Sequence, residues 1–295
     1  MFHHAMIAVD LDSQVPLLDC APDLAAWGVK RVSLVHLMKV GYAQGPGLGD
    51  DARYRQSLES LAEPLRARGL QVDIEVATAG DVGAAIASRA QEAAADLLVV
   101  GNRSHNVLER IFLGSVARKV LRRANVPVLI EWIEPSDGDG GRCHLSCSNT
   151  LRHVLVASDL TAAARPVHDA AVALASFGAH VDVVHVTSPE AQDRFAEWPA
   201  MAKAAVSEVN ARIIAAGGTG DTLVVEGEPR EQILRVATER DASLLVVGKA
   251  SHDRSSMGST ARALSKQAGR PVLVIPNVNP RVAASTTSAY DSPTV

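Results

Sequence analysis

Two short segments combine residue types that could bind a phosphate group. The first begins with residues 101–104 (Gly-Asn-Arg-Ser), continues for nine residues and ends at Gly114, Ser115 and Val116. Glycine lets the backbone approach a ligand closely, and a Gly-Ser pair that opens a helix presents N–H groups to an anion. Arg103 could add positive charge at the rim, and Ser104 a hydroxyl. A strand end and a helix cap would explain a single Gly-Ser pair equally well.

The second segment repeats this arrangement with a shorter loop. Residues 248–251 (Gly-Lys-Ala-Ser) are followed by six residues and then by Gly258, Ser259 and Thr260. Because this loop is three residues shorter than the first, we expect a phosphate-binding loop of a different shape, with Gly248 and Ser251 at its start. An apolar stretch that ends on an aspartate precedes each segment, at Asp10 and at Asp159.

These parallels extend over most of the chain and indicate a tandem duplication. The offset between the copies is 149 residues at the aspartates and 147 at the first glycines. We predict domain 1 at residues 1–133, a linker at 134–150, domain 2 at 151–277 and a flexible C-terminal tail at 278–295. The linker and the tail are rich in small polar residues and glycine or proline.

Within each copy, apolar strands alternate with amphipathic helices, which predicts an α/β fold with a parallel sheet covered on both faces. The expected strands are 5–9, 32–37, 71–76, 97–100 and 127–132, then 153–157, 181–186, 221–225, 244–247 and 272–275. The expected helices are 13–28, 51–68, 81–95 and 114–124, then 161–177, 190–216, 229–241 and 258–268. Such a sheet binds ligands beyond the carboxyl ends of its strands, where the aspartates and glycines fall.

The composition excludes several classes of protein. The net charge is −4 without a basic block, so a nucleic-acid partner is not expected. The N-terminus lacks the pattern of a secretory signal and the apolar runs are short, so we expect a cytoplasmic protein without a membrane partner. Three cysteines argue against a disulfide framework. The motifs of P-loop nucleotidases, dinucleotide-binding dehydrogenases and α/β-hydrolases are absent.

The glycine pattern, the strand-end aspartates and the final Pro-Val strands at 127–128 and 271–272 together resemble the universal stress protein family. Its signature is Gly-x2-Gly-x9-Gly-Ser/Thr after the fourth strand of a five-stranded α/β fold. The likeness spans residues 3–133 and 151–277. It implies two tandem Rossmann-like domains, similar to adenine nucleotide α-hydrolases. Their last strands would pair as an intrachain pseudo-dimer, and two such chains could form a homodimer.

The resemblance also implies a pocket for ATP or another adenine nucleotide, which a magnesium ion could accompany. In copy one, Val9 and Asp10 would lie by the ribose, Leu37 would flank the adenine, and the 101–116 segment would hold the phosphates. In copy two, Asp159 and Val186 occupy the matching positions. Ser104 replaces the second glycine of the signature, and the loop of copy two is short, so neither segment matches the family completely.

Other candidate residues have simpler interpretations. Cys143, His144 and Cys147 offer too few ligands in paired spacing for a structural zinc site, and a flexible linker explains them. His36 and His185 take equivalent strand positions, where each is expected to donate a hydrogen bond to a neighbouring carbonyl. The tryptophans share no spacing, so we expect them to be packing residues.

Three functions remain open. The favoured one is a stress-response module that binds an adenine nucleotide and so changes a surface that faces an unknown protein partner. A slow metal-dependent ATP hydrolase could use Asp10 or Asp159 to position a metal and water, although no base for the γ-phosphate is evident. A scaffold that binds no nucleotide is the third.

Overall fold

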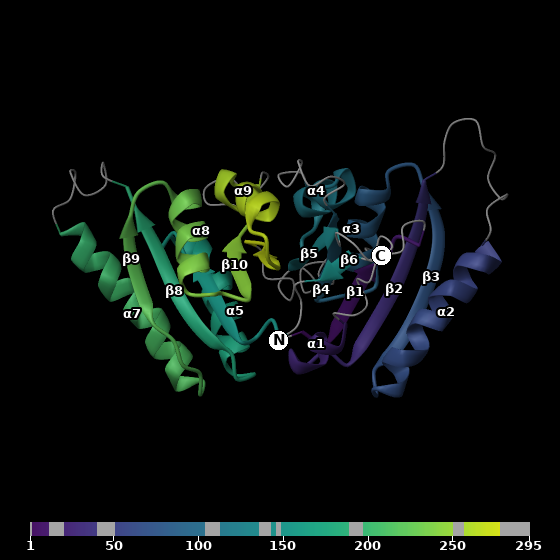
Figure 1. The fold of residues 1–295 in the computed structure, drawn as a ribbon, viewed down its shortest axis with the longest axis horizontal. Coiled ribbons are helices and arrows are strands. Elements are labelled where there is room, and N and C mark those ends of the chain that lie inside the picture. Colours follow the sequence, from purple (N-terminus) through teal and green to yellow (C-terminus); the bar gives the residue numbers. More distant parts are fainter. Residues whose placement is uncertain are drawn as a thin grey trace, which may run out of the picture.

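The computed structural model describes residues 2–11, 21–39, 51–103, 113–135, 143–145, 149–188, 197–249 and 257–277. Its strands form one 11-stranded sheet with the order β3-β2-β1-β4-β5-β11-β10-β7-β8-β9, and β6 pairs with β5 (Figure 1). The strand bounds in copy one are β1 (His4–Ala8), β2 (Arg31–Lys39), β3 (Gln71–Ala79), β4 (Leu97–Arg103) and β5 (Val128–Pro135). Those in copy two are β7 (His153–Ala157), β8 (His180–Thr187), β9 (Thr222–Glu226), β10 (Leu244–Gly248) and β11 (Val272–Ile275).

The last strands of the two copies join them into one sheet. Neighbouring strands within each copy are parallel, whereas β5 and β11 are antiparallel, with Leu129 opposite Leu273 at the centre of the contact. Both leucines are buried, at 1% and 0% exposure. The seam therefore covers two sheet edges that would otherwise be open to other chains. The expected α/β class, the tandem arrangement and the pairing of the last strands are confirmed.

Helices cover both faces of this sheet, which explains why its strands are apolar on both sides. One layer contains α1 (Ala21–Ala26), α2 (Asp51–Ala67), α5 (Arg165–Ala175) and α7 (Trp198–Ala215). The other contains α3 (Val82–Glu92), α4 (Ser115–Arg123), α8 (Pro229–Glu239) and α9 (Ser259–Gln267). Each layer's apolar cluster runs through both copies. None of the described helices is long and apolar enough to cross a membrane.

The segment between the copies contributes a strand that the sequence did not predict. β6 (Cys143–Leu145) pairs antiparallel with the end of β5, so part of the expected linker belongs to the sheet. The 3-10 helix η3 (Ala162–Ala164) precedes α5 and begins just after the aspartate Asp159.

The helix N-termini differ in a way that bears on ligand binding. Asp81 caps α3 by accepting from the backbone N–H of Ala84, and Glu228 caps α8 by accepting from Glu231. Like α5 and α7, the helices α4 and α9 have no hydrogen bond from a capping side chain, and each follows a glycine, Gly114 or Gly258. The first amides of these two helices lack intrahelical partners and can bind an external acceptor.

Two polar contacts link the copies across the seam. Asn102, which follows Gly101, donates from Nδ2 to the backbone oxygen of Ser265 in α9 at 3.4 Å. Lys249, which follows Gly248, donates from Nζ to the backbone oxygen of Ala124 at the end of α4 at 2.6 Å. The residue after Gly101 and the residue after Gly248 are thus each bonded to the opposite copy, at α9 and at the end of α4. Gly248 ends β10 as expected, whereas Gly101 lies inside β4, which continues past the expected end at residue 100 to Arg103.

Replacing Lys249 by methionine is expected to lower the free energy of unfolding by about 1–2 kcal/mol, because a hydrogen bond from a charged donor is lost and the Ala124 carbonyl keeps no such partner. Burial lowers the pKa of the Lys249 ammonium, consistent with its enclosure at the seam. Urea unfolding measures the change. Lys203→Met, at an exposed position of α7, is the control. Equal effects of the two substitutions would contradict a specific role for Lys249.

Candidate functional site

A cavity of about 530 Å³ lies in copy two at the carboxyl ends of β7, β8 and β10. The chain passes from β7 to β8 on one side and later returns to β10 on the other, so the cavity occupies the point where the strand order reverses. Open α/β sheets bind ligands at this point. The cavity walls come from the three strand ends, the start of α9 and the first turns of η3, α5, α7 and α8.

The end of β7 supplies a rigid polar wall. Asp159 accepts hydrogen bonds at Oδ1 from the backbone N–H and the hydroxyl of Thr161, at 3.0 and 2.8 Å. Leu160, between them, has a φ of +57°, a left-handed conformation that costs a residue with a side chain roughly 1–2 kcal/mol. The hydrogen bonds of this tight turn hold Asp159 at the cavity.

Ser158 adds a second anchor to the same turn. Its hydroxyl lies 2.7 Å from Nε2 of His168 and accepts a hydrogen bond from the backbone N–H of Leu160. Burial, and next the positive charge of Arg212, lower the pKa of His168, so the neutral imidazole can accept a hydrogen bond from the Ser158 hydroxyl. Ser158 is thereby held in one orientation at the cavity wall.

The end of β8 supplies an aromatic and polar wall. His185 donates from Nδ1 to the backbone oxygen of Ser158 at 2.9 Å, which leaves Nε2 as an acceptor. His185 Nε2, Thr187 Oγ1 and Trp198 Nε1 are buried and have no hydrogen-bond partner among the residues that the structure describes. Unpartnered buried polar atoms are costly, so three of them on cavity-lining side chains suggest that a ligand or water completes this wall.

The opposite end of the cavity is the N-terminus of α9. Gly258, Ser259 and Thr260 line it, and the backbone of Gly258 has φ −57° and ψ 153°. This conformation is open to any residue, so the backbone angles at this position do not require glycine. The uncapped amides and the helix dipole would favour an anion.

Copy one places the matching residues at the matching edge of its sheet. Val9 and Asp10 follow β1, which lies between β2 and β4, and Gly114 precedes α4. His36 donates from Nδ1 to the backbone oxygen of Val9 at 2.9 Å, the same contact that His185 makes in copy two. The expected hydrogen bond from each strand-end histidine to a neighbouring carbonyl is confirmed. A Cβ on Gly114 would meet no atom of the described residues within 4 Å.

Comparison with known proteins now assigns the fold to a family. The sequence model of the universal stress protein family matches residues 1–130 and 150–276, most of the chain and both copies. The chain belongs to the universal stress protein family. It is also 28% identical over 147 residues to universal stress protein YxiE of Bacillus subtilis, covering 44% of this chain and 99% of that protein.

Solved structures share the whole tandem architecture of this family member. A universal stress protein from Archaeoglobus fulgidus superposes with a TM-score of 0.69 at 21% identity, covering 93% of this chain and 98% of its own. The functionally unknown protein PA1789 of Pseudomonas aeruginosa gives 0.69 at 19% identity, with 97% and 98% coverage. At these identities the likeness concerns the fold.

The structure brings together most of the residues that the family resemblance singled out in copy two. The cavity is lined by Asp159, Val186, Gly248, Gly258, Ser259 and Thr260. Ser251 lies outside the described residues, as does Ser104 in copy one. Strand order places Val9, Asp10, Leu37 and Gly101 along one sheet edge, with Gly114, Ser115 and Val116 at the start of α4. Arg103 ends β4, and its side chain lies outside the described part.

Several cavity residues of this universal stress protein were missed by the sequence analysis. Thr161, Thr187 and Ile233 line the cavity without belonging to any motif. Trp198, expected only as a packing residue, also lines it and lies with its ring centroid 6.0 Å from that of His185. A polar residue that directly follows a strand-end aspartate could have indicated Thr161, but the approach of α7 to β8 is a tertiary contact.

Proposed function

We propose that this universal stress protein is a regulatory module that binds an adenine nucleotide in the cavity of copy two, with the corresponding sheet edge of copy one as a second site. The observation that carries the proposal is the pairing of an uncapped helix N-terminus with unpartnered polar atoms around one cavity of about 530 Å³. Its volume lies within the roughly 300–1,000 Å³ typical of small-molecule sites.

The two ends of the cavity suit the two ends of a nucleotide. Phosphate oxygens would accept from the first amides of α9, where the helix dipole favours negative charge. Val186, Ile233 and Trp198 offer apolar and aromatic surface for a base. The 6-amino group of adenine would supply the donor that His185 Nε2 lacks, whereas guanine presents a carbonyl oxygen at that position. Asp159 is placed to accept from ribose hydroxyls.

Calorimetric titration of the full chain with ATP, ADP, AMP and GTP tests this assignment. We expect saturable binding of an adenine nucleotide and weaker binding of GTP. Ser259→Glu should lower the affinity at least tenfold, about 1.4 kcal/mol, because its carboxylate would repel the phosphates. The same carboxylate interacts favourably with the positive end of the α9 helix dipole, so the thermal stability of the variant should be unchanged or slightly higher.

Ser115→Glu, the same change at the start of α4, is the matched variant for copy one. Loss of binding in Ser259→Glu alone would place the nucleotide in copy two, and loss in Ser115→Glu alone would place it in copy one. Trp198 supplies a second readout, since its fluorescence should change on binding and Trp198→Phe should remove that signal. Failure of every nucleotide to bind at millimolar concentration would overturn the proposal.

A further inference from the structure

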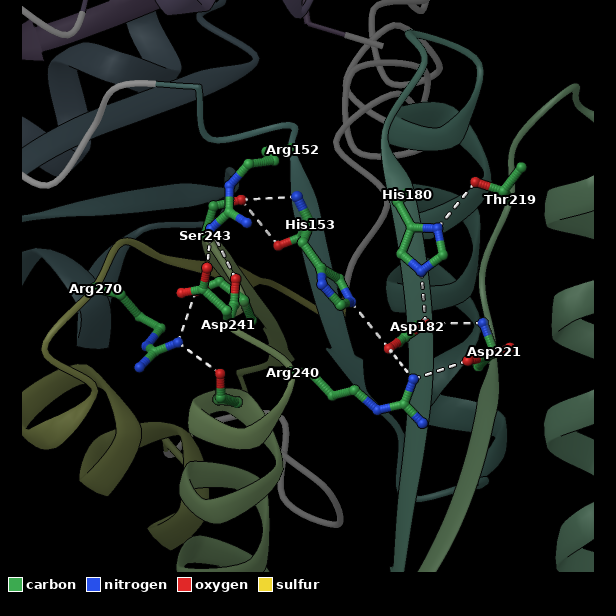
Figure 2. A network of polar contacts seen from close by, with 12 residues as sticks. Arg152, His153, His180, Asp182, Thr219, Asp221, Arg240, Asp241, Ser243 and Arg270 are labelled. Carbon is green, nitrogen blue, oxygen red and sulfur yellow. Dashed lines mark hydrogen bonds and ion pairs between the residues drawn. The ribbon is translucent and has the colours of Figure 1, made fainter.

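Two histidines and a buried aspartate converge at the opposite end of the copy-two sheet from the cavity (Figure 2). His153 begins β7 and His180 begins β8, and the two are direct partners in the strand register. Their ring centroids lie 4.7 Å apart, with the rings nearly perpendicular. Asp182 is two residues beyond His180, so its side chain points to the same face of the sheet.

The donor atoms of these residues lie close to one another. Asp182 Oδ2 is 2.9 Å from Nε2 of His153, and Asp182 Oδ1 is 3.2 Å from Nε2 of His180. One ligand atom from each residue falls within 4.8 Å of the others. The Asp182 side chain is 0% exposed and that of His180 is 39% exposed, so the group is anchored inside the protein and open to solvent on one side.

We propose that His153, His180 and Asp182 bind a divalent transition-metal ion of the zinc class. Zinc is coordinated by imidazole nitrogen and carboxylate oxygen at about 2.0–2.2 Å, and sites with three protein ligands keep a fourth position for water. Ligand atoms that are 2.9 and 3.2 Å apart need to separate little to surround such an ion. The metal binds the Nε2 lone pair of each neutral imidazole, so the ring proton must lie on Nδ1, which in His180 faces the hydroxyl of Thr219.

Neighbouring groups already orient two of the proposed ligands. Nδ1 of His180 lies 2.9 Å from the hydroxyl of Thr219, which leaves Nε2 directed at Asp182. The backbone N–H of Asp221 donates to Asp182 Oδ1 at 2.8 Å and holds the carboxylate in place (Figure 2). Partners of this kind fix the ring and carboxylate orientations in metal sites.

Arg240 is the one described cation in contact with Asp182. Its Nη1 lies 3.5 Å from Asp182 Oδ2 and 2.8 Å from Asp221 Oδ2. The guanidinium charge opposes a metal ion at this distance, and Asp221 offsets part of that charge. Arg240 therefore distinguishes two interpretations of these residues. Its charge would stabilise a purely structural ion-pair cluster, but it would weaken the binding of a metal ion.

Copy one forms the corresponding strand ends without this set of three ligands. His4 occupies the position of His153, but Arg31 and Ser33 stand where copy two has His180 and Asp182. There the imidazole Nε2 of His4 lies 2.8 Å from the Ser33 hydroxyl, and Arg31 pairs with Asp73 at 2.7 Å. The second imidazole and the buried carboxylate are specific to copy two, so the shared architecture does not require them.

Cobalt(II) titration of the metal-free full chain tests the proposal without any nucleotide. The three cysteines, Cys20, Cys143 and Cys147, are first replaced by serine so that thiolates do not compete. We expect one cobalt ion per chain, with the visible absorption of a nitrogen and oxygen site, displaced by zinc. His180→Ala should lower the affinity at least about tenfold, and Asp182→Asn should do the same. His4→Ala, at the matching position of copy one, should change nothing.

Arg240→Gln supplies the deciding measurement. Removal of its charge should tighten metal binding severalfold, whereas a purely structural ion-pair cluster would only lose stability. Zinc should also raise the melting temperature of the full chain with its cysteines replaced, because a ligand that binds the folded state stabilises that state. The melting temperature of the His180→Ala variant should not change. Absence of saturable binding, or binding that His180→Ala does not weaken, would overturn the proposal.

Discussion

Glu131→Gln is expected to remove a pronounced loss of stability between pH 5 and 8. Glu131 lies on β5 beside the seam, is 1% exposed, and its Oε2 has no hydrogen-bond partner in the described part of the chain. Burial, and next the negative charge of Asp23, raise the pKa of Glu131 from 4.5 to about 8. The protein therefore folds with this carboxyl protonated at neutral pH.

The sign of the effect follows from proton linkage. Below pH 4.5 the carboxyl is protonated in both the folded and the unfolded chain. Between pH 4.5 and 8 the unfolded chain releases the proton while the folded chain retains it, so the free energy of unfolding falls as the pH rises. At about 1.4 kcal/mol per pKa unit, the loss amounts to on the order of 5 kcal/mol by pH 8.

Urea unfolding at several pH values from 5 to 9 measures this dependence. The glutamine variant has no carboxyl at this position and should show a flatter profile, with its advantage over the natural chain growing towards alkaline pH. Glu208→Gln, at an exposed position of α7, should follow the natural profile. If the free energy of unfolding of Glu131→Gln falls with pH as steeply as that of the natural chain, the Glu131 carboxyl does not cause the loss of stability. Glu131 is the register partner of Gly101, so its ionisation would also place a charge beside Gly101 of β4.

Gly220→Ala is expected to destabilise copy two by about 3 kcal/mol or more, near the upper end of overpacking effects. A Cβ at this position would lie 1.8 Å from the backbone oxygen of Val181 and 2.5 Å from its carbonyl carbon. Main-chain atoms cannot rotate away as a side chain can. Val181 donates to Thr219 and Val183 to Asp221, at 2.7 and 2.9 Å, so both bonds that flank Gly220 would have to stretch.

Thermal and urea unfolding measure the loss, with Gly80→Ala as the control. A Cβ on Gly80 would meet no described atom within 4 Å, so that substitution should change stability by less than about 0.5 kcal/mol. Similar stabilities for the two variants would show that the Val181 backbone yields easily. Displacement of this segment would also move the Asp221 N–H away from Asp182, so metal binding should weaken in Gly220→Ala.

Local sequence patterns predicted most of the regular structure, because strands and helices follow from short-range periodicity. The strand expected at 272–275 matches β11, and the helix expected at 258–268 is α9 (Ser259–Gln267). The differences lie mainly at the ends, as with α3, which ends at Glu92 instead of residue 95. β6 was missed because a three-residue strand in a glycine-rich segment has no periodicity of its own.

Only some residues of the candidate nucleotide site could be predicted from the sequence. The strand-end aspartate and the Gly-Ser helix starts are local motifs, so Asp159 and Ser259 could be assigned to it. The short loop argued against copy two, yet the structure forms its described cavity there, because most of the walls come from strand ends and other helices. Trp198 and Thr187 reach it only through the packing of α7 and the course of β8.

The sequence by itself determined the duplication, the alternation of strands and helices, and the glycine-capped helix starts, since each follows from patterns among residues close together in the chain. Only the tertiary structure decided which distant residues meet. His153 and His180 face each other because parallel strands joined through a helix set the register, and Glu131 is buried on β5, the strand that pairs with β11 of the other copy. Such contacts depend on packing between elements, which no spacing along the chain records.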